Sequence, residues 1–72
     1  MTEQEAVGIA QTIAQRSGWL WLPPVQARRY RSWLIGAPRW VIWTNAQSLG
    51  MNVRIVLDDR DGLVLEKGFM PR

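Results

Sequence analysis

The sequence predicts a small α+β domain in which one N-terminal helix packs on a three- to four-stranded antiparallel sheet. Apolar residues recur at helical spacing near the N-terminus, while strand-forming residues dominate the rest of the chain. Short turn signals separate the expected strands. The chain has 72 residues, so we expect a single domain over residues 1–72, with no room for a second core.

The expected helix covers residues 3–16. Thr2 and Glu5 have the spacing of a capping box, in which each side chain satisfies a backbone N–H of the first turn. Gly18 suits the left-handed conformation that ends many helices. Four apolar residues follow at i, i+3, i+4 and i+7, and they form the face that should pack on the sheet: Ala6, Ile9, Ala10 and Ile13.

The next segment, residues 19–24, should be an extended connector whose tryptophans fold back on the core, because Pro23-Pro24 cannot lie in a central strand. A strand is predicted over residues 25–35 and its hairpin partner over residues 40–45, with residues 37–39 as the turn between them.

Two further strands complete the expected sheet, at residues 52–58 and 63–69. Apolar and polar side chains alternate along the first of them, as in a half-buried strand. The Asp-rich turn over residues 58–62 should be a tight hairpin in which Gly62 takes a positive φ. Five residues from the helix and this strand are expected to share one core: Ile9, Ile13, Val53, Ile55 and Leu57.

Charge is distributed unevenly along the chain. Nine basic and six acidic residues give a formal charge of +3, yet six arginines and no acid lie between Ala6 and Leu57. This basic segment favours anionic partners, or else keeps a tryptophan-rich sheet soluble.

The residue types exclude most catalytic and metal-binding chemistry. The chain has no histidine and no cysteine, so it lacks the commonest general base, the strongest nucleophile and the ligands of a zinc site. We interpret Asp58, Asp59 and Asp61 as solvated turn acids, and their spacing does not match a calcium-binding loop. We therefore predict no enzymatic activity, no catalytic residue, no metal and no cofactor.

No segment has the pattern of a membrane span or a targeting signal. The longest apolar run, residues 19–25, is far shorter than the ~18–20 residues that span a bilayer. The first five residues lack the positive charge of a signal peptide. We expect a cytoplasmic location.

The stretch "IVLDDRDGLVLEKGF" resembles the final hairpin of PepSY-type domains, in which a strand ends in Asp and Gly-x-Val-Leu begins the next. These positions are Asp58, Gly62, Val64 and Leu65. The helix with its alanines and the basic strand precede this hairpin in the same order as in PepSY-type domains. Small cystatin-like immunity proteins with a nuclear-transport-factor-like fold have a similar pattern of a helix, a Trp-Val strand and an Asp-x-x-x-Gly-x-Val hairpin. Either resemblance implies a binding or inhibitory module without catalytic residues.

The candidate partner-binding residues lie in "ARRYRSWLIGAPRWVIW", residues 27–43, where arginines and aromatics are interleaved. Arginines point to both faces of the first expected strand, which is typical of an edge strand. Trp and Arg are also the residue types most enriched in protein interfaces. The predicted site comprises Arg28, Arg29, Arg31, Trp33, Trp40 and Trp43.

We predict that this site binds a protein through the sheet face that lacks the helix, or through an edge strand. The exposed patch should include Arg31, Trp33 and either Trp40 or Trp43. Single-stranded nucleic-acid binding by the same hairpin is the alternative, since bases stack on aromatics while arginines contact phosphates. A homodimer is a further way for so short a chain to bury apolar area.

Overall fold

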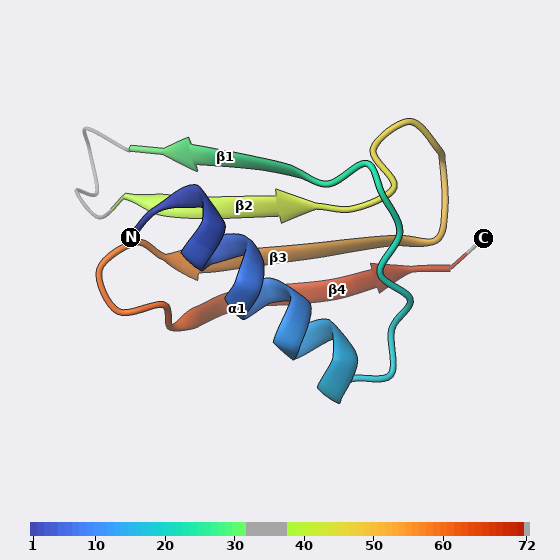
Figure 1. Ribbon diagram of the computed structural model, residues 1–72, viewed down its shortest axis with the longest axis horizontal. Helices are drawn as coiled ribbons and strands as arrows, with labels where there is room; N and C mark the ends of the chain where they lie inside the picture. Colours follow the sequence, from blue (N-terminus) through green and yellow to red (C-terminus); the bar gives the residue numbers. More distant parts are fainter. Residues whose placement is uncertain (32–37, 72) are drawn as a thin grey trace.

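The computed structural model describes residues 1–31 and 38–71, which form one helix and four strands (Figure 1). The strands make one antiparallel sheet in the order β1-β2-β3-β4, and the helix lies across one face of it. The α+β fold class predicted from the sequence is therefore confirmed. The elements are α1 (Glu3–Arg16), β1 (Gln26–Tyr30), β2 (Arg39–Trp43), β3 (Asn52–Asp58) and β4 (Val64–Met70).

Helix α1 has the bounds that its sequence signals predict. The Thr2 hydroxyl accepts a hydrogen bond from the Glu5 backbone N–H at 3.2 Å, and the Glu5 carboxylate accepts one from the Thr2 N–H at 2.8 Å. These reciprocal bonds satisfy two donors that the first helical turn would otherwise leave open. Gly18 takes a φ of 75° just after the last turn, a conformation that costs glycine little.

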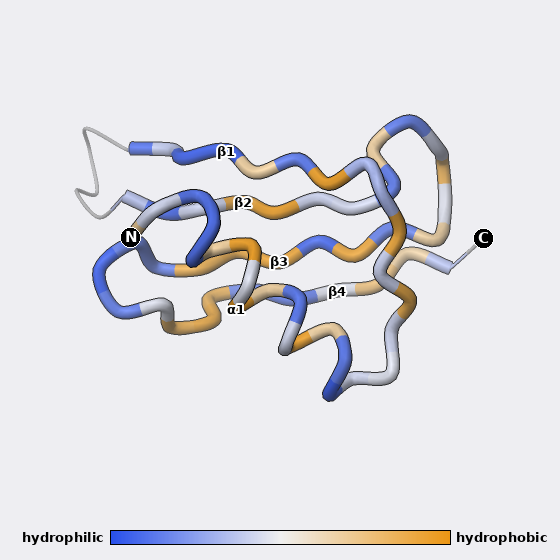
Figure 2. Tube along the Cα trace, in the orientation of Figure 1, coloured by the Kyte–Doolittle hydropathy of each residue, from blue (hydrophilic) through white to orange (hydrophobic). Residues whose placement is uncertain are grey.

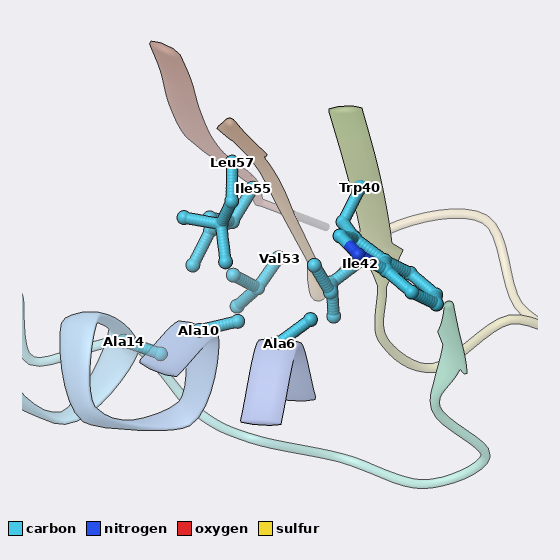
Figure 3. Packing of buried hydrophobic residues seen from close by; sticks show 8 residues of the cluster. All are labelled: Ala6, Ala10, Ala14, Trp40, Ile42, Val53, Ile55 and Leu57. Atoms are coloured by element: carbon cyan, nitrogen blue, oxygen red, sulfur yellow. The ribbon is translucent and has the colours of Figure 1, made fainter. Parts of the chain in front are cut away.

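The contact between α1 and the sheet is made by alanines. Ala6, Ala10 and Ala14 have no solvent exposure, and their methyl groups point at the aliphatic side chains of β2 and β3 (Figure 3). Side chains this small let the helix backbone lie close to the sheet. Ile9 and Ile13 are only half-buried along the flank of this contact. The predicted common core is confirmed, with the correction that its helical centre follows an i, i+4, i+8 spacing of alanines.

The connector after α1 packs on the helix side of the sheet, against β4. The helix runs obliquely and approaches β1, β2 and β3 (Figure 1). Trp19 stacks on Phe69 of β4 with 6.1 Å between ring centroids, and Trp21 also packs against the core. The prediction that the connector's tryptophans fold back is confirmed. The Pro23-Pro24 peptide bond is cis.

Several strand boundaries differ from the prediction. β1 begins at Gln26 instead of residue 25, β2 ends at Trp43 instead of residue 45, and β4 ends at Met70 instead of residue 69. Arg39, expected in a turn, begins β2, because it pairs with Tyr30 on one side and with Asp58 on the other. The rest of the predicted turn and the end of the first predicted strand fall on residues 32–37, which lie outside the described residues. Strand β4 begins at Val64, since the Leu63 carbonyl accepts a hydrogen bond from the Asp58 N–H and so belongs to the turn.

The loop between β2 and β3 is organised by the buried side chain of Asn52. Its amide nitrogen donates to the carbonyl oxygens of Thr44 at 2.8 Å and Asn45 at 2.9 Å, and its amide oxygen accepts from the Gly50 N–H at 2.8 Å. A buried amide needs such partners to offset its loss of water.

In the part of the chain that the structure describes, no helix has the length and apolar character to cross a membrane.

The turn between β3 and β4 gives a test of the fold. Gly62 has a φ of 72°, and an added Cβ would lie 3.0 Å from the Ile9 Cδ1 atom. We expect Gly62→Val to lower the free energy of unfolding by more than about 1 kcal/mol, because a β-branched residue is strained at positive φ. Chemical denaturation measures this change. Gly68→Val is the matched control, since its Cβ would meet nothing within 4 Å. Equal losses of unfolding free energy in both variants would contradict the positive φ and close contact assigned to Gly62.

Candidate partner-binding site

The pairing register assigns the side chains of the sheet to two faces. Residues directly opposite each other on neighbouring strands share a face, so Ala27, Ile42 and Ile55 lie together toward α1. Their immediate neighbours in sequence lie on the other side, which we call the open face. The residues of the open face are Gln26, Arg28, Tyr30, Arg39, Val41, Trp43, Asn52, Arg54, Val56, Asp58, Glu66, Gly68 and Met70.

Trp43 stands between two hollows on the open face. One hollow, of about 270 Å³, lies toward β1 and is lined by Arg28, Tyr30 and Val41. The other, of about 170 Å³, lies toward β4 and is lined in part by Gly68 and Met70. Gly68 contributes to this shape because it places no side chain beside the indole. The hollows give the half-buried indole of Trp43 two flanks that a partner's side chains can contact.

Ion pairs neutralise much of the charge on the open face. Arg54 on β3 pairs with Glu66 on β4 at 2.7 Å. Asp58 pairs with Arg60 at 3.1 Å and lies opposite Arg39 in the register. The arginine-rich segment and the acidic segment are separate in the sequence, but the sheet brings them side by side.

On the other side of the sheet, the carboxylate of Asp59 gathers three donors. The Trp40 indole N–H and the N-terminal ammonium group of Met1 donate to its Oδ1 atom, the latter at 3.3 Å. The Arg29 guanidinium donates to Oδ2 at 2.8 Å. The Asp59 side chain is only 9 % exposed. Burial by itself would raise the pKa of Asp59, but the three donors outweigh it and hold that pKa below its usual value.

This cluster corrects our interpretation of the turn acids. Asp58 and Asp59 are buried and paired with arginines, so the prediction that they are solvated is wrong for both. Asp61 alone matches it, because it is exposed and caps the Leu63 N–H at 2.9 Å. The sequence gives no sign of the difference, since the donors to Asp59 come from residues 19 to 58 positions away.

The structure divides the predicted site residues between the two faces. Arg28 and Trp43 lie on the open face, while Arg29 and Trp40 lie on the helix side and are held by Asp59. Arg31 is exposed just beyond the end of β1. Trp33 lies outside the described residues. Of the two tryptophans weighed for exposure, Trp43 is therefore the one on the open face.

Two residues of β4, Gly68 and Met70, border the site although our sequence analysis did not propose them. They are brought there by the register of β3 with β4, in which Arg54 lies opposite Gly68 and Asn52 opposite Met70. The alternation of side chains along two paired strands is the signal that could have found them. It was not sufficient by itself, because the β4 register also depends on a bulge near Leu57.

Comparisons of the chain with models of protein families, with curated proteins and with solved structures give no match. The resemblances to PepSY-type and cystatin-like domains stay predictions. The open face, the Asp59 cluster and the β1 edge are the features of the described residues that bear on function.

The Asp59 cluster makes stability depend on pH in a definite direction. A carboxylate whose pKa is lowered by folding stabilises the protein fully above its unfolded pKa, near 3.8, and this contribution is lost as the pH falls from there through the folded pKa. We therefore expect Asp59→Asn to have a lower melting temperature than wild type at pH 7. We expect the difference between the two melting temperatures to become smaller in acid. Asp61→Asn is the control, because it removes the same negative charge. We expect it to change the melting temperature little, since Asp61 is exposed.

Differential scanning fluorimetry between pH 7 and pH 3 gives both melting curves. Equal effects of the two substitutions would mean that the buried cluster contributes nothing to stability. A wild-type advantage over Asp59→Asn that persists undiminished below the folded pKa would contradict the assigned direction of the pKa shift.

Proposed function

We propose that this chain is a non-enzymatic binding domain that holds a partner protein against its open face. The observation that carries the proposal is the position of Trp43, half-buried between two hollows on the face opposite α1. Tryptophan supplies a large contact area in protein interfaces. Arg28 and Tyr30, both exposed at one flank, add a charge and a second aromatic ring.

The charges of the open face favour a protein over a nucleic acid. A polyanion needs a continuous positive surface along its phosphates. Here Glu66 and Asp58 lie on the same face as the arginines, and Arg54 is already neutralised by Glu66. A protein surface of mixed charge is compatible with this pattern, whereas a phosphate backbone that crosses all four strands meets two carboxylates.

Single-stranded nucleic-acid binding stays as the alternative because of one local feature. Arg28, Tyr30 and Trp43 line the same hollow at the β1 side of the open face, and an aromatic ring beside a guanidinium is what a stacked base and its phosphate require. Such a site would hold a short stretch of nucleotides over β1 and β2 only.

The absence of enzymatic activity is part of the same proposal. The chain has no histidine and no cysteine. The carboxylates of Asp58 and Asp59 are each bound by an arginine. The hydrogen bond from Arg60 is the main cause that lowers the pKa of Asp58. The pKa of Asp59 is also lowered, because its hydrogen-bond donors outweigh the effect of burial. A general acid at neutral pH needs the opposite shift.

The test compares partner capture by wild type and by Trp43→Thr, which keeps a β-forming residue in β2. Each tagged protein is incubated with extract of the source cells, with and without nuclease, and the bound proteins are quantified. We expect nuclease-resistant capture that Trp43→Thr lowers by about thirtyfold or more, the size of an interface hot spot. Leu20→Thr is the control, because Leu20 is 53 % exposed in the connector and is not part of the open face.

Three results would contradict the proposal. Capture that disappears with nuclease, together with binding of a labelled single-stranded oligonucleotide that weakens steeply with salt, would favour the nucleic-acid alternative. Capture lowered equally by Trp43→Thr and Leu20→Thr would mean that the open face is not the binding surface. Stable dimers in sedimentation that Trp43→Thr dissociates would show that a second copy occupies this face.

A further inference from the structure

The outer edge of β1 has backbone groups that the sheet does not use. β1 is the first strand in the sheet order, with β2 on one side only. In an antiparallel pair every second residue directs its N–H and C=O away from the partner strand. Within residues 1–31 and 38–71, no backbone hydrogen bond reaches this outer side of Gln26–Tyr30. The edge can therefore accept one more strand.

A groove of about 370 Å³ runs along β1 on the helix side of the sheet. The apolar lining residues are Val7 of α1, Val25 and Ala27. The polar rim on the helix consists of Glu3, Gln4 and Gln11, so small apolar side chains suit this groove and acidic ones do not. The alanines of α1 pack on the side chains of β2 and β3 (Figure 3), and the groove lies at the flank of this contact, between the helix and β1. Small apolar side chains of an added strand would find cover there.

The other side of the same edge is basic. Arg28 lies on the open face beside Tyr30, and in the described part of the chain neither Arg28 nor Arg31 forms an ion pair. Arg29, by contrast, is neutralised by Asp59. Figure 2 shows the end of β1 that carries these arginines as one of the most hydrophilic parts of the sheet. An acidic side chain next to Arg28 would supply the missing opposite charge.

The same arginines oppose pairing with a second copy of the chain. In a two-fold antiparallel pair, a residue at the centre faces its own copy. A pair centred on Arg28 would therefore place like charges directly opposite, which is destabilising. Charge at an edge strand commonly prevents self-association in this way. The charge of Arg28 therefore opposes self-pairing in this register, and it is complementary to an acidic strand.

We propose that the β1 edge binds an extended, acidic segment of the partner protein by strand addition. Small apolar side chains of that segment enter the groove between α1 and β1, and the alternating acidic side chains lie toward Arg28. Backbone hydrogen bonds supply affinity in this mode, and alternate side chains supply specificity. The inference rests on the proposed function and adds to it the conformation, the charge and the docking edge of the partner.

The opposite edge, β4, is less suited to such a segment. Its pairing with β3 contains an irregularity between Val56 and Leu57, which disturbs the regular spacing of the strand. Glu66 and Lys67 place opposite charges next to each other there, so β4 has no charge preference of one sign. This edge therefore serves as an internal reference for the experiment.

The experiment uses three labelled ten-residue peptides as probes. The first alternates valine with glutamate, the second alternates valine with lysine, and the third has five valines followed by five glutamates. Fluorescence anisotropy at concentrations where each peptide alone stays unstructured gives the affinity. We expect the first peptide to bind at least about tenfold more tightly than either of the others, because only it combines acidic charge with strand alternation.

Two substitutions locate the binding. Arg28→Glu should weaken the first peptide by about tenfold or more, while Arg16→Glu, an equal charge change at the end of α1, should weaken it by less than about twofold. Ala27→Leu fills the groove and should weaken binding with no loss of melting temperature, since the groove has room for the larger side chain. Amide hydrogen exchange should slow in β1 on binding and stay unchanged in β4.

Several outcomes would overturn strand addition at β1. They are equal binding of the alternating and the block peptide, equal effects of Arg28→Glu and Arg16→Glu, or slowed exchange in β4 instead of β1. Concentration-dependent assembly of the protein alone, by pairing of β1 with β4 of another copy, would also overturn it. The two proposals can fail separately. Nuclease-resistant capture that needs Trp43 but is insensitive to Arg28→Glu and Ala27→Leu would retain the binding domain and reject the β1 edge. Capture lowered equally by Trp43→Thr and Leu20→Thr would reject the open face as the binding surface, whatever the peptides show.

Discussion

The buried carboxylate of Asp59 is the interaction on which the arrangement of the other elements depends. It lies just after β3 and receives donors from the first residue of the chain, from Arg29 in β1 and from Trp40 in β2. Removing a carboxylate from water is costly unless charges and donors replace its hydration. Trp40 has the complementary need, because a buried indole N–H requires an acceptor. One side chain therefore joins the start of the helix, two strands and the turn before β4.

The same interaction decides which residues are left for a partner. Side chains alternate along a strand, so holding Arg29 on the helix side places Arg28 on the open face. In β2, holding Trp40 on the helix side places Trp43, three residues later, on the opposite side. A single carboxylate thus divides the basic and aromatic residues of the segment into a structural pair, Arg29 and Trp40, and a pair on the open face, Arg28 and Trp43. Their chemical types alone do not distinguish the two pairs.

Local signals explain what could be predicted from the sequence. The capping box of Thr2 and Glu5 and the turn glycine Gly62 depend only on neighbouring residues, and both were found in the structure as expected. The alternation along residues 52–58 likewise identified β3 with its bounds. The role of Asp59 could not be predicted, because its partners are distant in sequence and a turn acid is solvated by default. The neutralisation of Arg54 by Glu66 depends in the same way on the register of β3 and β4.

The open face follows from the size of the chain, but its composition does not. A helix of 14 residues is ~21 Å long and ~10 Å wide, so it can cover only one side of four strands spaced about 4.8 Å apart. An uncovered face of an antiparallel sheet is usually polar. Here its centre carries Val41, Trp43 and Val56. Its arginines are spread over three strands, with Arg28 on β1, Arg39 on β2 and Arg54 on β3, where Glu66 neutralises Arg54. We therefore place the first contacts of the proposed partner at β1, where the outer strand edge is unpaired and Arg28 forms no ion pair within the described residues.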